Sequence, residues 1–278
     1  MKSTGRKPVN SSSIETSLTD KFFRRQRLKL ILTVIGFAFL YYAASSLTKF
    51  NFIESFSAVP RVVKWFFTNL VPDAKAMERL PKILDKLVET IFMSIMATVT
   101  AAVFSFLFAL MGSTTTRANA FVGGIARTVA TVMRNIPVAV WAMIFLLAFG
   151  QSNFTGFLAL FFYTFGFLTR AFIETIDEAS ASSVEALRAA GASYPQIIAQ
   201  AVVPASLPQM ISWILYMIET NIRSATLVGL LTGSGIGFMF DIYFKSLQYK
   251  SAALVILSLV VVVLAIELIS NALRRLIL

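Results

Sequence analysis

The chain contains no cysteine and no histidine. Without cysteine it can form no disulfide, thiolate metal site or cysteine nucleophile. Without histidine it lacks the commonest general base and the commonest metal ligand. Together, these absences argue against an enzyme, and we expect neither a metal site nor a cofactor.

Charged residues are also scarce. They make up 14% of the chain, whereas 57% of its residues are hydrophobic, and soluble domains carry about 25% charged residues. The mean hydropathy is +0.75. A chain of 278 residues with this composition is expected to be an integral membrane protein. Its class should be all-α, because a helix satisfies its own backbone inside a bilayer.

Acidic residues are outnumbered, with 14 Asp and Glu against 25 Lys and Arg, and the net charge is +11. This balance suggests contact with anionic lipid headgroups, an acidic partner or an anionic solute. Nucleic acid is a poor fit, because the charges flank apolar runs instead of forming one face. The chain has no glycine-rich loop followed by Lys-Ser or Lys-Thr, so no ATP site of its own is expected.

The distribution of apolar residues predicts the domain organisation. Residues 1–27 are Ser/Thr-rich and basic, which indicates a disordered cytoplasmic tail. Residues 28–278 form the predicted transmembrane domain, with about six helices of the length needed to cross a bilayer. Arg274 and Arg275 place the C-terminus in the cytoplasm as well. The expected spans are residues 28–48, 88–112, 122–149, 154–174, 202–222 and 250–273.

Residues 49–86 form the expected external segment. Its apolar residues recur at helical spacing, which predicts a helix lying in the membrane interface. A landing surface for an external protein is the alternative. The residues on this stripe are Phe56, Val59, Val63, Phe66 and Phe67.

A polar segment, residues 178–204, interrupts the apolar runs and is expected on the cytoplasmic side. Ser182, followed by Glu185 three residues later, predicts a capping box that opens a short helix. Gly191 stands where a C-terminal glycine would end that helix.

The capping pattern repeats with Ser193 and Gln196, which predict a second short helix that ends at Pro204. Two short helices bent at a glycine would make a rigid hairpin able to dock into a partner. An ordinary solvated helix–turn–helix is the alternative.

This hairpin resembles the EAA loop of bacterial ABC importer permeases. The matching positions, at the family's spacing, are Glu185, Ala186, Gly191 and Pro204. The departures are Leu187, Ala201 and Val203, all apolar replacements. The resemblance implies that the four matching residues couple the chain to an ATP-binding subunit.

Polar residues inside membrane segments are costly unless they pair or function. Arg134 precedes Pro137 in the third predicted span, and proline kinks a helix. Such a kink beside an arginine suits a solute path. Alternatively, Arg134 extends to the interface and Pro137 only shapes the packing.

A second polar cluster lies in residues 219–237, where we expect a re-entrant turn. Arg223 could pair with Glu219, four residues earlier on one helical face. Alternatively, it could meet an oxyanion, together with Asn221, Ser224 and Thr226. The glycines expected to allow close packing or positive φ in the turn are Gly229, Gly233, Gly235 and Gly237.

Residues 221–229, Asn-Ile-Arg-Ser-Ala-Thr-Leu-Val-Gly, followed by Gly-Ile-Gly at 235–237, resemble the signature of phosphonate-type ABC permeases. Thr-Gly-Ser at 232–234 departs from the family's Gly-Ala-Gly. The resemblance implies a type I ABC importer permease (MetI-like) for phosphonate, phosphite or a related oxyanion. It also implies a multi-pass protein of the bacterial inner membrane, assembled as a homodimer with two ATP-binding subunits and an external substrate-binding protein.

Other functions remain open at this point. A related permease could carry another small solute, such as methionine. A secondary transporter could use Glu219, Asp241 and Glu267 as proton carriers, although no inverted repeat is visible. A lipid-modifying enzyme would have few groups with which to work.

Overall fold

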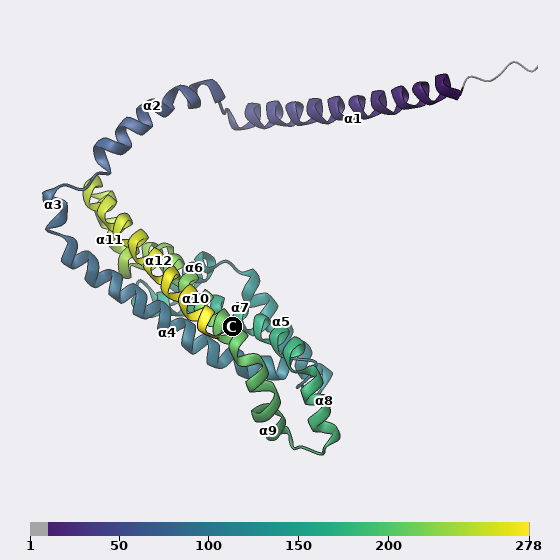
Figure 1. Cartoon of the computed structure of the whole chain (residues 1–278). Helices are drawn as coiled ribbons and strands as arrows, with labels where there is room; N and C mark the ends of the chain where they lie inside the picture. The colour runs from purple at the N-terminus through teal and green to yellow at the C-terminus, as the bar shows by residue number, and fades with distance from the viewer. Residues whose placement is uncertain (1–10, 278) are drawn as a thin grey trace, which may run out of the picture. The chain divides into compact units, whose positions relative to one another are not determined.

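The computed structural model describes the backbone of residues 11–277 and the side chains of residues 25–51 and 54–275. Every regular element in this described part is a helix (Figure 1), which confirms the all-α class. The chain divides into two units, residues 1–64 and residues 65–278.

The first unit contains α1 (Ser11–Thr48), whose Arg25–Thr48 part is long and apolar enough to cross a membrane. None of the side chains in that part is buried, as expected for a helix surrounded by lipid. The prediction of a disordered tail is wrong for residues 11–27, which are helical. They extend an existing helix, so they need no new nucleus. Residues 1–10 lie outside the described residues.

The predicted amphipathic segment does form a helix, α2 (Phe52–Asn69), which contains Pro60. A single turn, α3 (Ala74–Met77), follows it. Asp73 caps α3, because its side chain accepts a hydrogen bond from the backbone N–H of Ala76 at 2.9 Å.

The centre of the second unit is the pair α4 (Leu80–Gly112) and α7 (Asn153–Ala179), and α10 (Val203–Thr232) packs against both. Small buried residues on α4, including Ala97 and Ala109, let the neighbouring backbones approach closely. Large side chains such as Phe172 fill the space between the helices.

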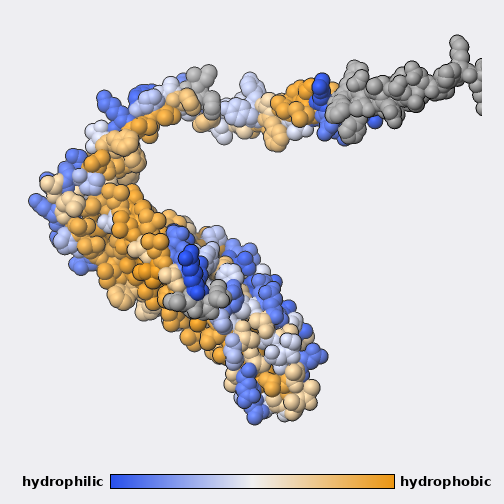
Figure 2. Space-filling view, viewed as in Figure 1, coloured by the Kyte–Doolittle hydropathy of each residue, from blue (hydrophilic) through white to orange (hydrophobic). Residues whose placement is uncertain are grey.

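The two ends of this bundle are polar. In Figure 1, the hairpin of α8 (Ala181–Ala189) and α9 (Tyr194–Ile197) lies at one end of the second unit, and α3 lies at the other. Figure 2 shows apolar surface along the middle of the bundle between more hydrophilic ends. This distribution matches a bundle whose middle lies in the hydrocarbon core of a bilayer.

The third predicted span, 122–149, is not a single helix. It consists of α5 (Ala120–Asn135) and α6 (Val138–Phe149), which meet at an angle of 92°. Pro137 forces Ile136 out of the helical region, to φ −87° and ψ 118°, and this breaks the helix. The described residues therefore contain five helices that are long and apolar enough to cross a membrane, or six such segments if this bent pair counts as one.

The expected re-entrant turn is shorter than predicted. α10 continues without a break to Thr232, and α11 (Gly235–Lys245) starts three residues later. The polar and small residues after Glu219 therefore stay helical and pack against neighbouring helices. The last helix, α12 (Tyr249–Ile277), packs against α10 and α11.

Candidate functional site

The candidate coupling hairpin consists of α8 (Ala181–Ala189) and α9 (Tyr194–Ile197), and the chain turns at Gly191 with φ 79°. The N–H of Ala192 donates to the carbonyl of Leu187 at 3.0 Å, the bond that characterises a Schellman ending. A Cβ at Gly191 would meet no atom within 4 Å, so the positive φ alone requires the glycine. The predicted bend is confirmed.

The caps of the hairpin are only partly as predicted. α8 begins at Ala181 after Ser180, so Ser182 lies inside the helix and Glu185 makes no capping bond. The helix starts early because only Ser180 separates it from α7. In the second helix the predicted pairing is present, since the N–H of Ser193 donates to Oε1 of Gln196 at 2.8 Å.

Pro204 does not end the second helix, contrary to the prediction. α9 continues through a π-helical turn, Ile198–Val202, into α10. In this turn the N–H of Val203 donates to the carbonyl of Ile198, five residues earlier. A π turn shifts the helical bonding, which lets the helix accommodate a residue that lacks an N–H.

The hairpin combines an exposed outer side with a buried root. Val184 and Ile197 are buried and belong to the core cluster that includes Phe172. A rigid, accessible projection of this kind can fit a partner's groove. The four predicted coupling residues are all exposed: Glu185, Ala186, Gly191 and Pro204.

In the candidate substrate region, Glu219 lies between two arginines. Its Oε1 is 3.0 Å from Nη2 of Arg223 on α10, and its Oε2 is 3.7 Å from Nη2 of Arg274 on α12. The side chain of Glu219 is 10% exposed, whereas that of Arg223 is 47% exposed. Arg223 therefore has the partner that the sequence suggested, yet keeps much of its guanidinium accessible.

Asn221 faces a different direction from Arg223, which differs from the prediction that the two share one path. It is fully buried, and its Nδ2 donates to the hydroxyls of Thr98 at 2.8 Å and Thr164 at 2.7 Å. Residues two positions apart on a helix point to nearly opposite sides. Asn221 therefore faces away from Arg223 and joins α10 to α4 and α7.

The three other predicted path residues take no part in the ion pairs of Glu219 or the hydrogen bonds of Asn221 among the described residues. Ser224 is half-buried, and the buried hydroxyl of Thr226 has no partner among the described residues. Arg134 is exposed at the end of α5, with its guanidinium 5.4 Å from the ring centroid of Phe167. That contact supports a cation–π interaction.

The glycines after Glu219 have two distinct uses. Gly233 ends α10 with φ 68°, and Gly235 opens α11 with φ 57°. Gly229 and Gly237 lie inside the helices. An added Cβ at Gly229 would overlap the backbone oxygen of Ser234, just before α11, and one at Gly237 would overlap that of Thr226 on α10. These two glycines permit α10 and α11 to touch. The four glycines thus divide between the two predicted roles: Gly229 and Gly237 allow close packing, and Gly233 and Gly235 adopt positive φ.

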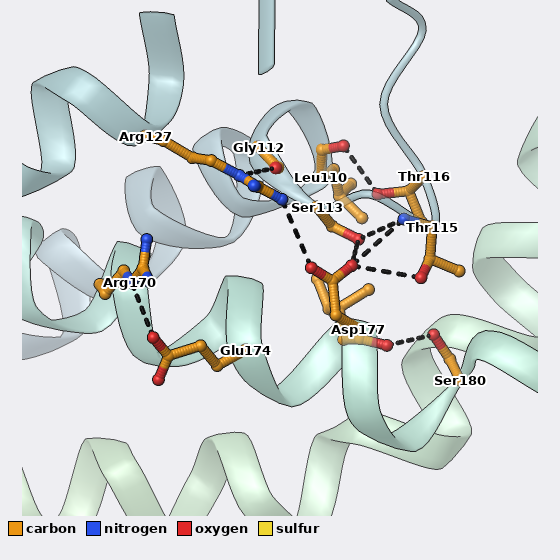
Figure 3. Close-up of polar contacts among 11 residues, drawn as sticks. Leu110, Gly112, Ser113, Thr115, Thr116, Arg127, Arg170, Glu174, Asp177 and Ser180 are labelled. Carbon is orange, nitrogen blue, oxygen red and sulfur yellow. Dashed lines mark hydrogen bonds and ion pairs between the residues drawn. The ribbon is translucent and has the colours of Figure 1, made fainter. Parts of the chain in front are cut away.

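Sequence reasoning missed a polar cluster around Asp177, in the last turn of α7 (Figure 3). Its Oδ1 accepts hydrogen bonds from Oγ of Ser113 at 2.5 Å and from the N–H of Thr115 at 3.2 Å. Its Oδ2 is 3.5 Å from Nη2 of Arg127. An acid at a helix C-terminus opposes the helix dipole, so its position was a signal that donors lie nearby.

At the opposite end of the second unit is a polar cavity of about 310 Å³. Lys250 reaches Asp73 across it at 3.2 Å. The backbone N–H of Ala76 and then the Lys250 ammonium lower the pKa of the Asp73 carboxyl. Arg79 donates to Gln248 on the same wall. These contacts tie α3 to the start of α12.

A membrane-spanning helical bundle with an exposed hairpin at one end has the features of a transporter subunit. Residues 109–278 match the family described as "Binding-protein-dependent transport system inner membrane component", and the chain belongs to this family. It is therefore a multi-pass permease subunit of the bacterial inner membrane and not an enzyme. Family membership implies association with ATP-binding subunits and a substrate-binding protein.

Two curated relatives are similar in sequence. One is the "Phosphite transport system permease protein PtxC" of Stutzerimonas stutzeri, 33% identical over 68% of this chain and 69% of that protein. The other is the "Phosphate-import permease protein PhnE" of Mycolicibacterium smegmatis, 31% identical over 69% of this chain and 36% of that protein.

Solved structures support the fold. An amino acid ABC transporter aligns with a TM-score of 0.62 at 16% identity, over 73% of this chain and 98% of that chain. The MetNI methionine ABC transporter in an inward-facing form aligns with a TM-score of 0.56 at 16% identity, over 71% of this chain and 98% of that chain. The predicted type I importer architecture is confirmed.

Proposed function

We propose that this chain carries a phosphonate, or a related phosphorus oxyanion such as phosphite, across the membrane in an ATP-driven importer. One observation carries the proposal: the family match includes both the exposed hairpin and the Arg223 region, and the relatives of the chain are named for phosphite and phosphate. A guanidinium suits a tetrahedral oxyanion, because it offers forked donors and a fixed charge.

Within this function, Arg223 is the residue proposed to meet the solute, with Ser224 and Thr226 nearby and Arg134 as a second candidate. Glu219 holds Arg223 from the buried side at 3.0 Å. Asn221 acts from inside the bundle, where it fixes α10 against α4 and α7 through Thr98 and Thr164.

The proposed assembly contains two copies of this chain. A dimer of ATP-binding subunits docks on the two hairpins, through the surface around Glu185, Ala186, Gly191 and Pro204. An external binding protein delivers the solute at the opposite end of the bundle. The differential contacts that ATP makes possible then drive the change between two states of the bundle.

The test is uptake of labelled phosphite by vesicles that contain this chain with its ATP-binding subunits and binding protein. Uptake that requires ATP, and that methylphosphonate but not methionine inhibits, supports the proposal. Inhibition by methionine instead would favour a methionine permease. Uptake that persists without ATP and collapses with the proton gradient would refute the importer and favour a secondary transporter.

A further inference from the structure

We propose that Asp177 is a positioning residue for transport: it clamps the loop between α4 and α5 so that this loop moves together with the coupling helix α8. Through this clamp, movement of the hairpin would reach α4 and α5 directly, as well as α7 and α10 along the chain. The inference rests on the proposed importer function, because it assumes that an ATP-driven subunit moves the hairpin.

The first part of the clamp fixes the loop to α7. One carboxylate oxygen of Asp177 accepts from the hydroxyl of Ser113 at 2.5 Å and from both the N–H and the hydroxyl of Thr115 at 3.2 Å. In Figure 3 these groups converge on the carboxylate from the loop that follows α4. Hydrogen bonds to an ionised group are about twice as strong as neutral ones, so this corner is held firmly.

The second part ties α5 to the same corner. Arg127 of α5 places Nη2 3.5 Å from the other oxygen of Asp177. Its Nε donates to the carbonyl of Gly112, the last residue of α4, at 2.7 Å. One guanidinium therefore bridges the ends of α4 and α7 from α5.

The third part reaches the coupling helix. Nη2 of Arg188, in the last turn of α8, donates to the carbonyl of Thr115 at 2.7 Å. Thr115 is thus held from two sides, by Asp177 through its N–H and hydroxyl and by Arg188 through its carbonyl. Residues 73 positions apart in the sequence join here, so α8 is linked to a loop that is not its neighbour along the chain.

This arrangement gives the hairpin a second route into the bundle. α5 leads directly to the 92° break before α6, and α4 is the main packing partner of α7. Hydrogen bonds weaken steeply when donor and acceptor separate or misalign. A rotation of α8 must therefore either carry the loop along or break the Arg188–Thr115 bond. The charge on Arg188 strengthens that bond, which favours the first outcome.

The chain offers a matched control. Nε of Arg170 lies 2.6 Å from Oε1 of Glu174, but both residues are on α7, and within the described part of the chain the pair makes no ion pair or side-chain hydrogen bond to another element. Figure 3 shows this pair beside the Asp177 cluster. Arg170→Met removes a comparable ion pair near the same end of the bundle without loosening the loop.

The experiment compares Arg188→Met, Asp177→Asn and Arg170→Met in the complete transporter, by the amount of phosphite imported per ATP hydrolysed. We expect the first two variants to keep their ATP-binding subunits and to hydrolyse ATP. The amount of phosphite that they import per ATP should fall at least about fivefold, because fivefold is the low end of typical coupling between two sites. Arg188→Lys should restore much of the ratio, because it keeps a charged donor. Arg170→Met should resemble the unaltered chain.

A wild-type ratio in both Arg188→Met and Asp177→Asn would overturn the clamp. So would an equal loss in Arg170→Met, or dissociation of the ATP-binding subunits, which would make the role one of docking.

A second measurement does not depend on the solute. The chain lacks cysteine. Cysteines introduced at the exposed positions Ala118 and Ala189 would therefore be the only sites in this chain that a thiol-reactive spin label modifies. We expect the distance between the two labels to stay constant when ATP binds to the unaltered complex. In Arg188→Met, the distribution of this distance should become broader. A large change in the unaltered complex would refute the clamp, even if phosphite proved to be the wrong solute.

Discussion

The substitution Gly191→Val tests the hairpin most directly, because its cost has a single source. The residue has φ 79°, and no atom lies within 4 Å of the position that a Cβ would take. The new side chain therefore meets no steric obstacle beyond its own backbone. A left-handed conformation costs a non-glycine residue about 1–2 kcal/mol, and a β-branched residue is worse there.

A cost of that size lowers the ratio of bent to unbent turn by a factor of about 5–30. We expect uptake of labelled phosphite to fall by up to that factor, while the chain still inserts in the membrane at its normal level. The ATP-binding subunits should copurify less well, since the strained turn lies beside the proposed docking surface.

Gly191→Asn is the matched control, because asparagine adopts the left-handed conformation more readily and also ends helices. We expect Gly191→Asn to retain most of the uptake that Gly191→Val loses, at equal amounts of membrane protein. Uptake by Gly191→Val at the wild-type rate would refute the docking role of the hairpin. An equal loss in both variants would show that the side chain matters and that φ does not.

Three further predictions follow from other parts of the chain. Arg223→Gln should abolish phosphite uptake while Glu219→Gln spares it; an equal loss in both would make the pair structural, and normal uptake by Arg223→Gln would remove it from the path. Gly237→Ala should lower the free energy of unfolding by about 1–3 kcal/mol through overlap with the facing helix, whereas Gly124→Ala, where a Cβ would meet nothing within 4 Å, should not destabilise the purified complex on heating. The isolated chain should show no ATP binding by calorimetry, and an affinity comparable to that of the whole complex would contradict the separation of roles.

Features that depend on a few neighbouring residues could be predicted from the sequence. The bend at Gly191 follows from a residue type whose backbone freedom is a local property, and the Ser193–Gln196 pairing follows from spacing within one turn. The Arg223–Glu219 pair is of the same kind, since residues four apart on a helix are neighbours. Hydropathy likewise predicted the membrane class, because it sums over whole segments.

Features that depend on how helices continue could not be predicted in the same way. Pro137 predicts a kink, but the sequence around it does not predict the angle of 92° between α5 and α6. Pro204 predicts the end of a helix, yet the helix continues through a π turn that accommodates the proline. In both cases, whether the helix breaks or continues depends on whether packing against neighbouring helices offsets the hydrogen bond that proline cannot donate. Helix propensity alone does not predict this packing.

The clamp around Asp177 could not be predicted for a different reason. Its partners come from the end of α4, the following loop and α5, which are distant in sequence, and each residue alone resembles ordinary polar surface near a helix end. The one local sign was an acid placed against the helix dipole. Polar groups near a helix end can be satisfied by water, so that sign alone does not demand a protein partner. The apolar contacts between α4 and α7 are non-directional, whereas the bonds of Asp177 and Arg188 fix a geometry. In the proposed clamp, directed movement of the hairpin reaches α4 and α5 through these polar contacts at the base of the bundle, which hydropathy does not reveal.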